Sequence, residues 1–237
     1  MASEPTVITL YDLVFDNDVR PSPFCWRTKL ALKHKGLTWR DEPMGFTEKD
    51  KIAFAQSQTV PVLHDGTSVV KDSWAIALHL DKAYPERPLF PGDPAMAHAR
   101  FVNGWADTAI NSLIFPMVVG DMLGAVRPQD RDYIIESRSK RIGTKDFASV
   151  QEKARENGIA TLRQALEPAR RFLREQPFLS GETPAYADYT LFGSLFWPHI
   201  FAKKLELLDK DDVLFGWRER MLDLFDGFGR KAKRAST

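Results

Sequence analysis

Hydrophobic and polar residues alternate between strand-like and helix-like periods over the first 85 positions. Residues 7–11 form a short β-branched run, which predicts a buried strand. Ser22 and Pro23 suit the cap and the first turn of a helix, and Gly36 suits its end. Residues 37–41 can then form a second strand. The pattern therefore begins with a strand, a helix and a strand.

The next stretch, residues 49–56, is charged and predicts a weak helix or a loop. Two short runs, residues 59–64 and 68–70, are joined by Asp-Gly and predict a β-hairpin. Asp72 then caps a further helix. Its apolar residues at helical spacing are Ile76, Ala77, Leu80 and Tyr84. The resulting order, β-α-β-α-β-β-α, is that of a thioredoxin-like α/β domain.

A proline-rich stretch separates this region from the rest of the chain. Residues 85–94 contain four prolines and a glycine, which interrupt regular structure. Beyond them strand signals nearly vanish, so we predict an all-α C-terminal domain. The predicted division is a thioredoxin-like domain over residues 1–86, a linker over 87–94 and a helical domain over 95–237. Helices are expected from Asp93, over 162–173 with a bend at Pro168, over 187–200 and over 214–228, while 124–147 is ambiguous.

The charge balance narrows the classes of function. The 237 residues include 33 Lys and Arg against 32 Asp and Glu, a net charge of +1. Such a balance argues against a protein built around nucleic acid or an anionic membrane surface. The basic cluster at residues 230–234 is interpreted as a solvated end, with anion binding or localisation as the alternative. No apolar run approaches the roughly 18 residues of a membrane span, so no membrane association is expected.

Cysteine and histidine are sparse. Cys25 is the single cysteine, which excludes an internal disulfide and suits a reducing cytosol. The start of the chain lacks a signal-peptide pattern, so we expect a cytoplasmic protein. The histidines lack ligand spacing, and no metal site is expected. They are His34, His64, His79, His98 and His199.

The segment Ser22-Pro-Phe-Cys25 opens the first predicted helix directly after the first strand. Backbone N–H groups and the helix dipole favour an anion there, and they lower the pKa of a nearby thiol from about 8.5. The hydroxyl of Ser22 could donate a hydrogen bond to a bound thiolate. The alternative is that Ser22 serves only as a helix cap.

Two further features follow. A proline before a strand leaves backbone groups of the preceding residue free, and a cis bond at Val60-Pro61 would offer those of Val60 to an extended peptide ligand. Asp72 and Ser73 start a helix, where a carboxylate, a hydroxyl and free N–H groups can hold the charged end of a γ-glutamyl group. The alternatives are an ordinary Val-Pro pair and a plain capping pair.

Together and in this order, the three features resemble those of glutathione transferases, and the resemblance covers nearly the whole chain. It implies glutathione as co-substrate, with its cysteinyl backbone held at Val60-Pro61, its γ-glutamyl end at Asp72 and Ser73, and its thiol activated by Ser22. The implied glutathione-binding residues are Ser22, Phe24, Gln58, Thr59, Val60, Pro61, Asp72 and Ser73. The resemblance also implies a homodimer.

Longer strings are similar to one subgroup, the bacterial glutathione-dependent β-aryl etherases of lignin breakdown and the fungal etherase-like transferases of the FuA class. The strings are residues 8–12, 22–29, 31–36, 72–74 and 224–227. The Ser22 segment also resembles the Cys-Pro-Tyr-Cys site of glutaredoxins with serine in place of the first cysteine. Serine can stabilise a thiolate but cannot form a mixed disulfide. Cys25 is expected to be a small buried side chain, with a reactive thiol as the alternative.

One position departs from the family pattern. Transferases usually have Ser or Thr three residues before the aspartate that starts the core helix of the second domain. Here Ala185 stands three residues before Asp188. Either the cap shifts to Thr183, or Asp188 acts with backbone groups alone.

The second substrate is expected between the first helix, the loop over residues 12–20 and the helices after the linker. The candidates for an apolar cleft are Phe15, Ile110, Phe115, Met117 and Met122, although core residues show the same spacing. The leading interpretation is a transferase whose serine-stabilised glutathione thiolate attacks a hydrophobic aromatic electrophile, such as a β-aryl ether, or a peroxide. The alternatives are a ligandin that binds hydrophobic aromatics with little turnover, and an oxidoreductase that uses Cys25.

Overall fold

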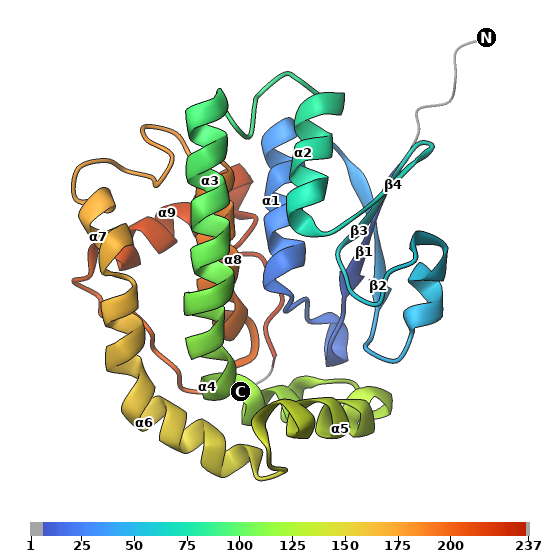
Figure 1. The fold of residues 1–237 in the computed structure, drawn as a ribbon, viewed down its shortest axis with the longest axis vertical. Coiled ribbons are helices and arrows are strands. Elements are labelled where there is room, and N and C mark those ends of the chain that lie inside the picture. Colours follow the sequence, from blue (N-terminus) through green and yellow to red (C-terminus); the bar gives the residue numbers. More distant parts are fainter. Residues whose placement is uncertain (1–6, 236–237) are drawn as a thin grey trace.

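The computed structural model describes residues 7–235 as a small mixed sheet with its own helices, followed by a helical domain (Figure 1). The strands are β1 (Ile8–Leu13), β2 (Trp39–Met44), β3 (Val62–Asp65) and β4 (Ser68–Lys71), in the order β2-β1-β3-β4. β1 runs parallel to β2 and antiparallel to β3, which is antiparallel to β4. The predicted thioredoxin-like order is confirmed, with the weak second helix formed as a 3₁₀ helix, η2 (Lys49–Ala55).

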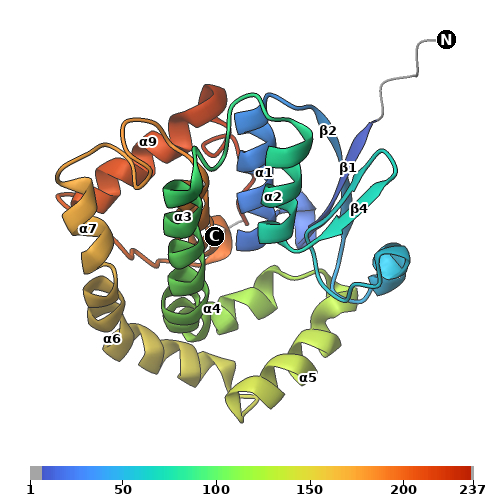
Figure 2. The ribbon, with the colours of Figure 1, turned by 45° about the horizontal axis from the view of Figure 1, so that its top comes forward.

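The two long helices of the first domain are capped as the sequence predicts. Ser22 caps α1 (Pro23–Lys35), which ends at Gly36 with a φ of 69°, a left-handed conformation that glycine adopts freely. Asp72 caps α2 (Ser73–Ala83). Both helices lie between the sheet and the helical domain (Figures 1 and 2). This places the start of each helix at the boundary between the domains.

The second domain is all-helical, as predicted. Its helices are α3 (Asp93–Trp105), the π-helical turn η3 (Ala106–Ile110), α4 (Asn111–Ala125), the 3₁₀ turn η4 (Pro128–Asp130), α5 (Arg131–Ile142), α6 (Phe147–Ala165), α7 (Glu167–Leu173), α8 (Tyr186–Phe201) and α9 (Val213–Gly227). α8 is buried along almost its whole length, as its apolar sequence predicts. α1 and α3 both pack against it. The predicted linker over 87–94 overlaps the start of α3 by two residues.

Two predicted helices have different ends from those expected. The bend predicted at Pro168 is a break: α6 ends at Ala165, and Pro168 stands in the first turn of α7. Proline cannot donate an internal helical hydrogen bond but suits the first turn of a new helix. In α9 the backbone leaves the helical conformation at Leu224, and Phe225 and Asp226 have positive φ angles of 52° and 59°. The last helix is therefore regular over a shorter span than 214–228.

Asp188 caps α8 without a hydroxyl partner. Its carboxylate accepts four hydrogen bonds of 2.7 to 3.2 Å, and Ala185 is the cap residue. The donors are the backbone N–H groups of Leu179, Ser180 and Ala185 and the indole of Trp217. The cap therefore does not shift to Thr183. Asp188 acts with backbone groups, as in the second alternative, but the indole of Trp217 donates to it as well.

The helical domain fixes the start of both α1 and α2. A Cβ atom on Gly193 of α8 would lie 2.5 Å from the carbonyl oxygen of Pro23, so only glycine allows this close approach. The hydroxyl of Tyr186 donates to the carbonyl of Ser73 at 2.8 Å. Both contacts join α8 to the first turn of a helix in the other domain.

The buried side chain of Arg27 in α1 adds a polar link. Its Nη2 donates to Asp107 at 2.7 Å and to Ser194 at 3.3 Å, and its Nη1 donates to Asn103 at 3.4 Å. A buried guanidinium is stable only where such partners replace water. Arg27 thus ties the site-bearing helix to α3, η3 and α8.

Within the described residues, the helical run Asp93–Ala125 is long and apolar enough, by length and composition, to cross a membrane. This corrects the expectation that no such run exists. Its most apolar window is half buried within the protein, with α3 packed on α8 and α4 on α6. We therefore interpret it as part of the helical core.

Candidate functional site

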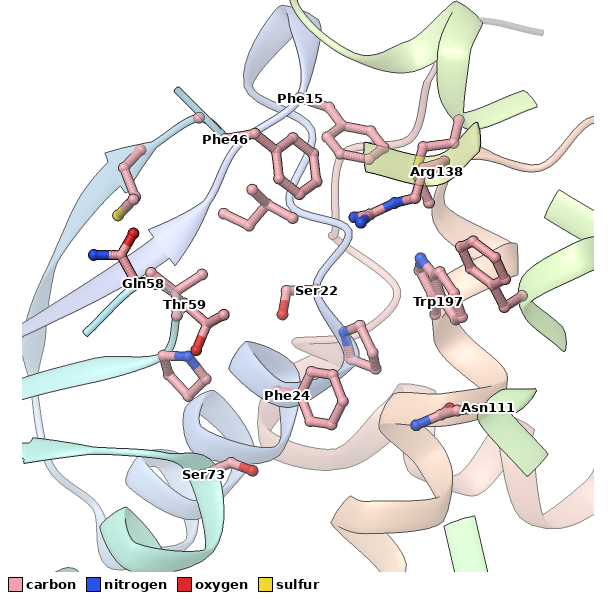
Figure 3. Close-up of a pocket in the computed structure, with 18 of the residues that line it drawn as sticks. Phe15, Ser22, Phe24, Phe46, Gln58, Thr59, Ser73, Asn111, Arg138 and Trp197 are labelled. Atoms are coloured by element: carbon pink, nitrogen blue, oxygen red, sulfur yellow. The ribbon is translucent and has the colours of Figure 1, made fainter. Parts of the chain in front are cut away.

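A cavity of about 490 Å³ lies between the two domains. Its walls come from the starts of α1 and α2, the residues before β3, and the helices α4, α5 and α8 (Figure 3). Segments far apart in the sequence therefore meet at one site. A cavity of this size suits a small organic ligand.

All the residues implied as glutathione-binding line this cavity. They are Ser22, Phe24, Gln58, Thr59, Val60, Pro61, Asp72 and Ser73. They come from three separate segments, and Figure 3 shows Gln58, Thr59 and Ser73 along one side with Ser22 near the centre. The structure brings the three sequence features together, while their role in binding stays a prediction.

Ser22 is buried, with 5% of its surface exposed, and its Oγ accepts a hydrogen bond from the N–H of Cys25 at 3.2 Å. This bond is the helix cap of the alternative interpretation. A hydroxyl that accepts one bond still has its own hydrogen to donate. The cap and a hydrogen bond to a ligand in the cavity are therefore compatible.

Cys25 is fully buried, one helical turn from Ser22. Burial, together with the negative charge of Asp12, raises the pKa of the Cys25 thiol well above its ordinary value. The thiol stays protonated, which makes it a poor nucleophile. The prediction of a small buried side chain is confirmed.

The Val60–Pro61 peptide bond is cis, as predicted. Ser57 shapes the turn before it: its hydroxyl donates to the carbonyl of Thr59 at 2.8 Å and accepts from the N–H of Thr59 at 3.3 Å. The carbonyl of Pro61 accepts from the N–H of Asp72 at 3.3 Å. The second and third sequence features are therefore hydrogen-bonded to each other.

Asp72 has a φ of 77°, and its Oδ1 accepts from the N–H groups of Trp74 at 2.9 Å and Ala75 at 3.1 Å. Both capping bonds use the same oxygen. Over residues 7–235, Oδ2 has no hydrogen-bond partner. The carboxylate therefore caps α2 and keeps one oxygen for a ligand.

Three of the five candidates for the apolar cleft line the cavity, and their role in binding a substrate stays a prediction. Phe15, Phe115 and Met122 line the cavity, but Ile110 and Met117 do not. Ile110 is fully buried in η3, and Met117 points toward Gly158 of α6. Apolar residues at helical spacing satisfy a core and a cleft equally well, so spacing alone could not separate them.

Sequence reasoning missed most of the aromatic and cationic wall. Phe46 stacks on Tyr133 with ring centroids 6.0 Å apart, and Phe115 stacks on Trp197 at 6.4 Å. The missed lining residues are Leu13, Pro23, Met44, Gly45, Phe46, Lys49, Asp107, Asn111, Tyr133, Arg138, Arg141 and Trp197. Arg138 and Arg141 are three residues apart within the ambiguous stretch 124–147. This spacing predicts that they share one face of a helix, but it does not predict which part of the protein that face contacts.

Comparison with known families decides the classification. Residues 97–224, more than half of the chain, match the family described as glutathione S-transferase, C-terminal domain. Residues 21–83 match the glutathione S-transferase, N-terminal domain. The chain belongs to the glutathione S-transferase family.

Individual relatives agree. A probable glutathione S-transferase of Glycine max is 24% identical over 210 residues, which cover 85% of this chain and 80% of the relative. The glutathione transferase GSTFuA3 of Phanerochaete chrysosporium has a TM-score of 0.74 at 21% identity, covering 98% of this chain and 99% of that one. A glutathione S-transferase of Ceriporiopsis subvermispora in complex with glutathione has a TM-score of 0.72 at 22% identity, covering 95% and 94%. Both solved structures share the fold of this chain, and one of them is a FuA protein.

In this glutathione S-transferase the cavity has two chemically distinct sides. Ser22, Asp72 and the residues before β3 present polar atoms, while α4, α5 and α8 present aromatic rings and the cations of Arg138 and Arg141. Among the described residues, no group of three or more His, Cys, Asp or Glu side chains is placed to hold a metal ion.

Proposed function

We propose that this glutathione S-transferase binds glutathione along the polar side of the cavity and ionises its thiol beside Ser22. The thiolate would then attack a hydrophobic aromatic electrophile, β-aryl ethers among them, or a peroxide. The observation that carries the proposal is the convergence of three sequence-distant segments on one cavity, with the Ser22 hydroxyl at the helix start between them. A related structure that contains glutathione supports it.

In this mechanism Asp72 and Ser73 hold the γ-glutamyl end, and the backbone of Val60 pairs with the cysteinyl residue of glutathione. The sulfur then lies near Ser22 at the start of α1, where the helix dipole favours negative charge. The Ser22 hydroxyl donates to the thiolate and stabilises it. Attack on an electrophilic carbon forms a carbon–sulfur bond, and the leaving group departs with its electron pair.

The aromatic wall also favours a second candidate, a ligandin that binds hydrophobic aromatics in the same cavity with little turnover. An aromatic ligand would bury against the rings of Phe15, Phe115 and Trp197 whether or not it reacts. A role of Cys25 as a redox nucleophile is disfavoured because its thiol is buried and protonated. Turnover of aromatic electrophiles, peroxides and β-aryl ethers, set beside displacement of a bound dye, separates transferase from ligandin.

The mechanistic test is the pKa of bound glutathione in the variant Ser22→Ala. Removal of one charge-assisted hydrogen bond should raise the pKa of the bound thiol by about one unit, for about 1.4 kcal/mol lost. Glutathione affinity should fall much less because the contacts at Val60 and Asp72 remain. Thiolate absorbance followed against pH gives the value. An unchanged pKa and unchanged turnover would show that Ser22 is only a helix cap.

A further inference from the structure

Arg138 of α5 reaches into the aromatic side of the cavity without an anionic partner. Its guanidinium lies 5.4 Å from the ring centroid of Phe46 and 6.0 Å from that of Phe115. Its Nε is buried without a hydrogen-bond partner, and no ion pair to Arg138 occurs over residues 7–235. Ring faces attract a cation but leave the N–H edge of the guanidinium without acceptors.

Other enclosed arginines of this protein are paired. Arg27 meets Asp107 at 2.7 Å, Arg127 meets Asp130 at 2.8 Å, and Arg170 meets Asp212 at 2.8 Å. A partly buried cation without a counter-charge is costly, and burial lowers the pKa of Arg138 from its ordinary value. Its position facing a cavity means that a bound ligand can supply the missing anion.

Neighbouring charges strengthen this positive end. Arg141, one turn further along α5, lies 3.9 Å from the centroid of Phe115, and Lys49 lies 4.9 Å from that of Tyr133. Both line the cavity. Two acidic residues line the cavity: Asp107 is already paired with Arg27, and Asp72 caps α2 on the polar side. Positive charge and aromatic surface therefore coincide on the side where the acceptor would bind.

We propose that the acceptor is an aromatic carboxylate, whose ring lies among Phe46, Phe115 and Trp197 and whose carboxylate is bound by Arg138. This inference deepens the proposed function and rests on it. The planar guanidinium matches a carboxylate with two parallel hydrogen bonds, and a carboxylate on a ring is close to coplanar with it. One ligand can thus satisfy both the aromatic wall and the cation.

The site differs from the one proposed for glutathione. Figure 3 shows Gln58, Thr59 and Ser73 on one side of Ser22 and Arg138 on the other side. A carboxylate at Arg138 would place the ring it carries on the side of Ser22 that faces Trp197. There the glutathione sulfur can bond to an electrophilic ring carbon while that carbon's bond to its leaving group breaks, and the leaving group departs as an anion. The carboxylate takes no part in the step.

The test compares ligands of nearly equal shape that differ in charge. Calorimetry measures the affinity of 2-naphthoate and of 2-naphthamide, with and without glutathione, for wild type, Arg138→Met, Arg138→Lys and Arg131→Met. Arg131 is exposed on the same helix outside the cavity lining, so its variant controls for net charge. Wild type should prefer the carboxylate by roughly tenfold or more, the ratio expected of one charge-assisted contact. Arg138→Met should abolish this preference, Arg138→Lys should keep part of it, and Arg131→Met should keep all of it.

Three results would overturn the inference. The first is that wild type binds 2-naphthoate no more tightly than 2-naphthamide. The second is that Arg138→Met weakens the binding of both ligands equally, which would show that Arg138 has a structural role. The third is a loss of glutathione affinity in Arg138→Met as large as the loss of naphthoate affinity, which would assign Arg138 to a carboxylate of glutathione.

A kinetic comparison separates this inference from the proposed function. The substrates are 4-chloro-3-nitrobenzoate and 4-chloro-3-nitrobenzamide, in which the thiolate displaces chloride. The ratio of kcat/KM for the acid over the amide should fall roughly tenfold in Arg138→Met relative to wild type. If no glutathione-dependent turnover of either compound is found but the charge preference in binding depends on Arg138, the transferase proposal fails and the anion site stands. If turnover is found but the preference for the carboxylate over the amide is missing, the anion site is refuted and the transferase proposal stands.

Discussion

Thr47 and Asp130, from different domains, are joined by two hydrogen bonds to a single carboxylate oxygen. The N–H of Thr47 donates to Oδ1 of Asp130 at 2.9 Å, and its hydroxyl donates to the same atom at 2.7 Å. The other oxygen accepts from Nε of Arg127 at 2.8 Å. Because Phe46 precedes Thr47 and Arg138 follows Asp130 along α5, this pair sets the spacing of the aromatic side of the cavity.

The pair should make stability depend on acid pH. Burial alone would raise the pKa of Asp130, but hydrogen bonds from Arg127 and Thr47 outweigh it and hold the pKa below its ordinary value. A folded-state pKa below the unfolded one gives stability that is present above about pH 4 and lost as the pH falls through the folded value. Asp130→Asn should therefore lower the free energy of unfolding by about 1–3 kcal/mol at pH 7.

Urea unfolding of wild type and Asp130→Asn at pH 7 and pH 3 gives the measurement. The difference between the two proteins should shrink at pH 3, because wild type has by then begun to lose its charged contact. An equal difference at both pH values would contradict this account.

Gly45→Ala should disturb the same contact through sterics instead of charge. A Cβ at this position would collide with the side chains of Arg127 and Asp130. We expect a loss of about 1–3 kcal/mol in the free energy of unfolding, together with weaker binding of aromatic ligands because Phe46 is displaced. Gly104→Ala provides the control, since its Cβ would meet nothing within 4 Å. If Gly45→Ala and Gly104→Ala have the same free energy of unfolding and the same affinity for a dye, the proposed steric clash at Gly45 is refuted.

Asp72 should show two separable roles. Asp72→Asn keeps an oxygen that can cap α2, and asparagine tolerates the positive φ of 77°. It loses the charge proposed to bind the glutathione ammonium group. The melting temperature should change little, while glutathione affinity falls roughly ten- to a hundredfold, about 1.5–3 kcal/mol. Asp72→Ala should lose affinity and stability together. Calorimetry that finds wild-type affinity in both variants would remove Asp72 from the site.

Ser22→Cys should change the type of reaction. It places a thiol at the start of α1, where the helix dipole favours the thiolate, so the variant should gain thiol transfer toward a glutathione mixed disulfide. Conjugation should fall because the hydroxyl donor is lost. Cys25→Ala alone should leave conjugation at the wild-type level, since the buried thiol faces no ligand. Thiol transfer that is absent in Ser22→Cys, or conjugation lost in Cys25→Ala, would contradict these assignments.

The family resemblance predicts a homodimer in which the first domain of one chain meets the helical domain of the other. Exposed apolar side chains are available for such contact on both domains, Phe54 on η2 with 51% of its surface exposed and Phe101 on α3 with 71%. Sedimentation at micromolar concentration should give twice the 27.0 kDa of one chain. A mass of 27.0 kDa across the concentration range would exclude the dimer.

The sequence predicts the first domain better than the second. Ser22, Gly36 and Asp72 mark helix ends by local chemistry, which acts over a few residues and needs no tertiary contact. The polar side of the cavity follows from those helix starts. The aromatic side depends on packing between distant segments, as in the contact of Thr47 with Asp130. No local pattern shows that the charged helix α5 faces a cavity, or that Met117 turns toward α6.

The close approach of Gly193 to Pro23 limits how the two halves of this protein can be recombined. Consider a chimera that joins this first domain to the helical domain of a relative with a larger residue at the position of Gly193. That residue would displace the start of α1 from its contact with α8. The Ser22 hydroxyl would move with it, although every residue of the first domain is native. Domain exchange within the family should therefore succeed only when the residue facing Pro23 and the polar partners of Arg27 are transferred as well. Directed evolution of the helical domain for new acceptors meets the same constraint, because substitutions near Gly193 change the thiol site and the acceptor site together.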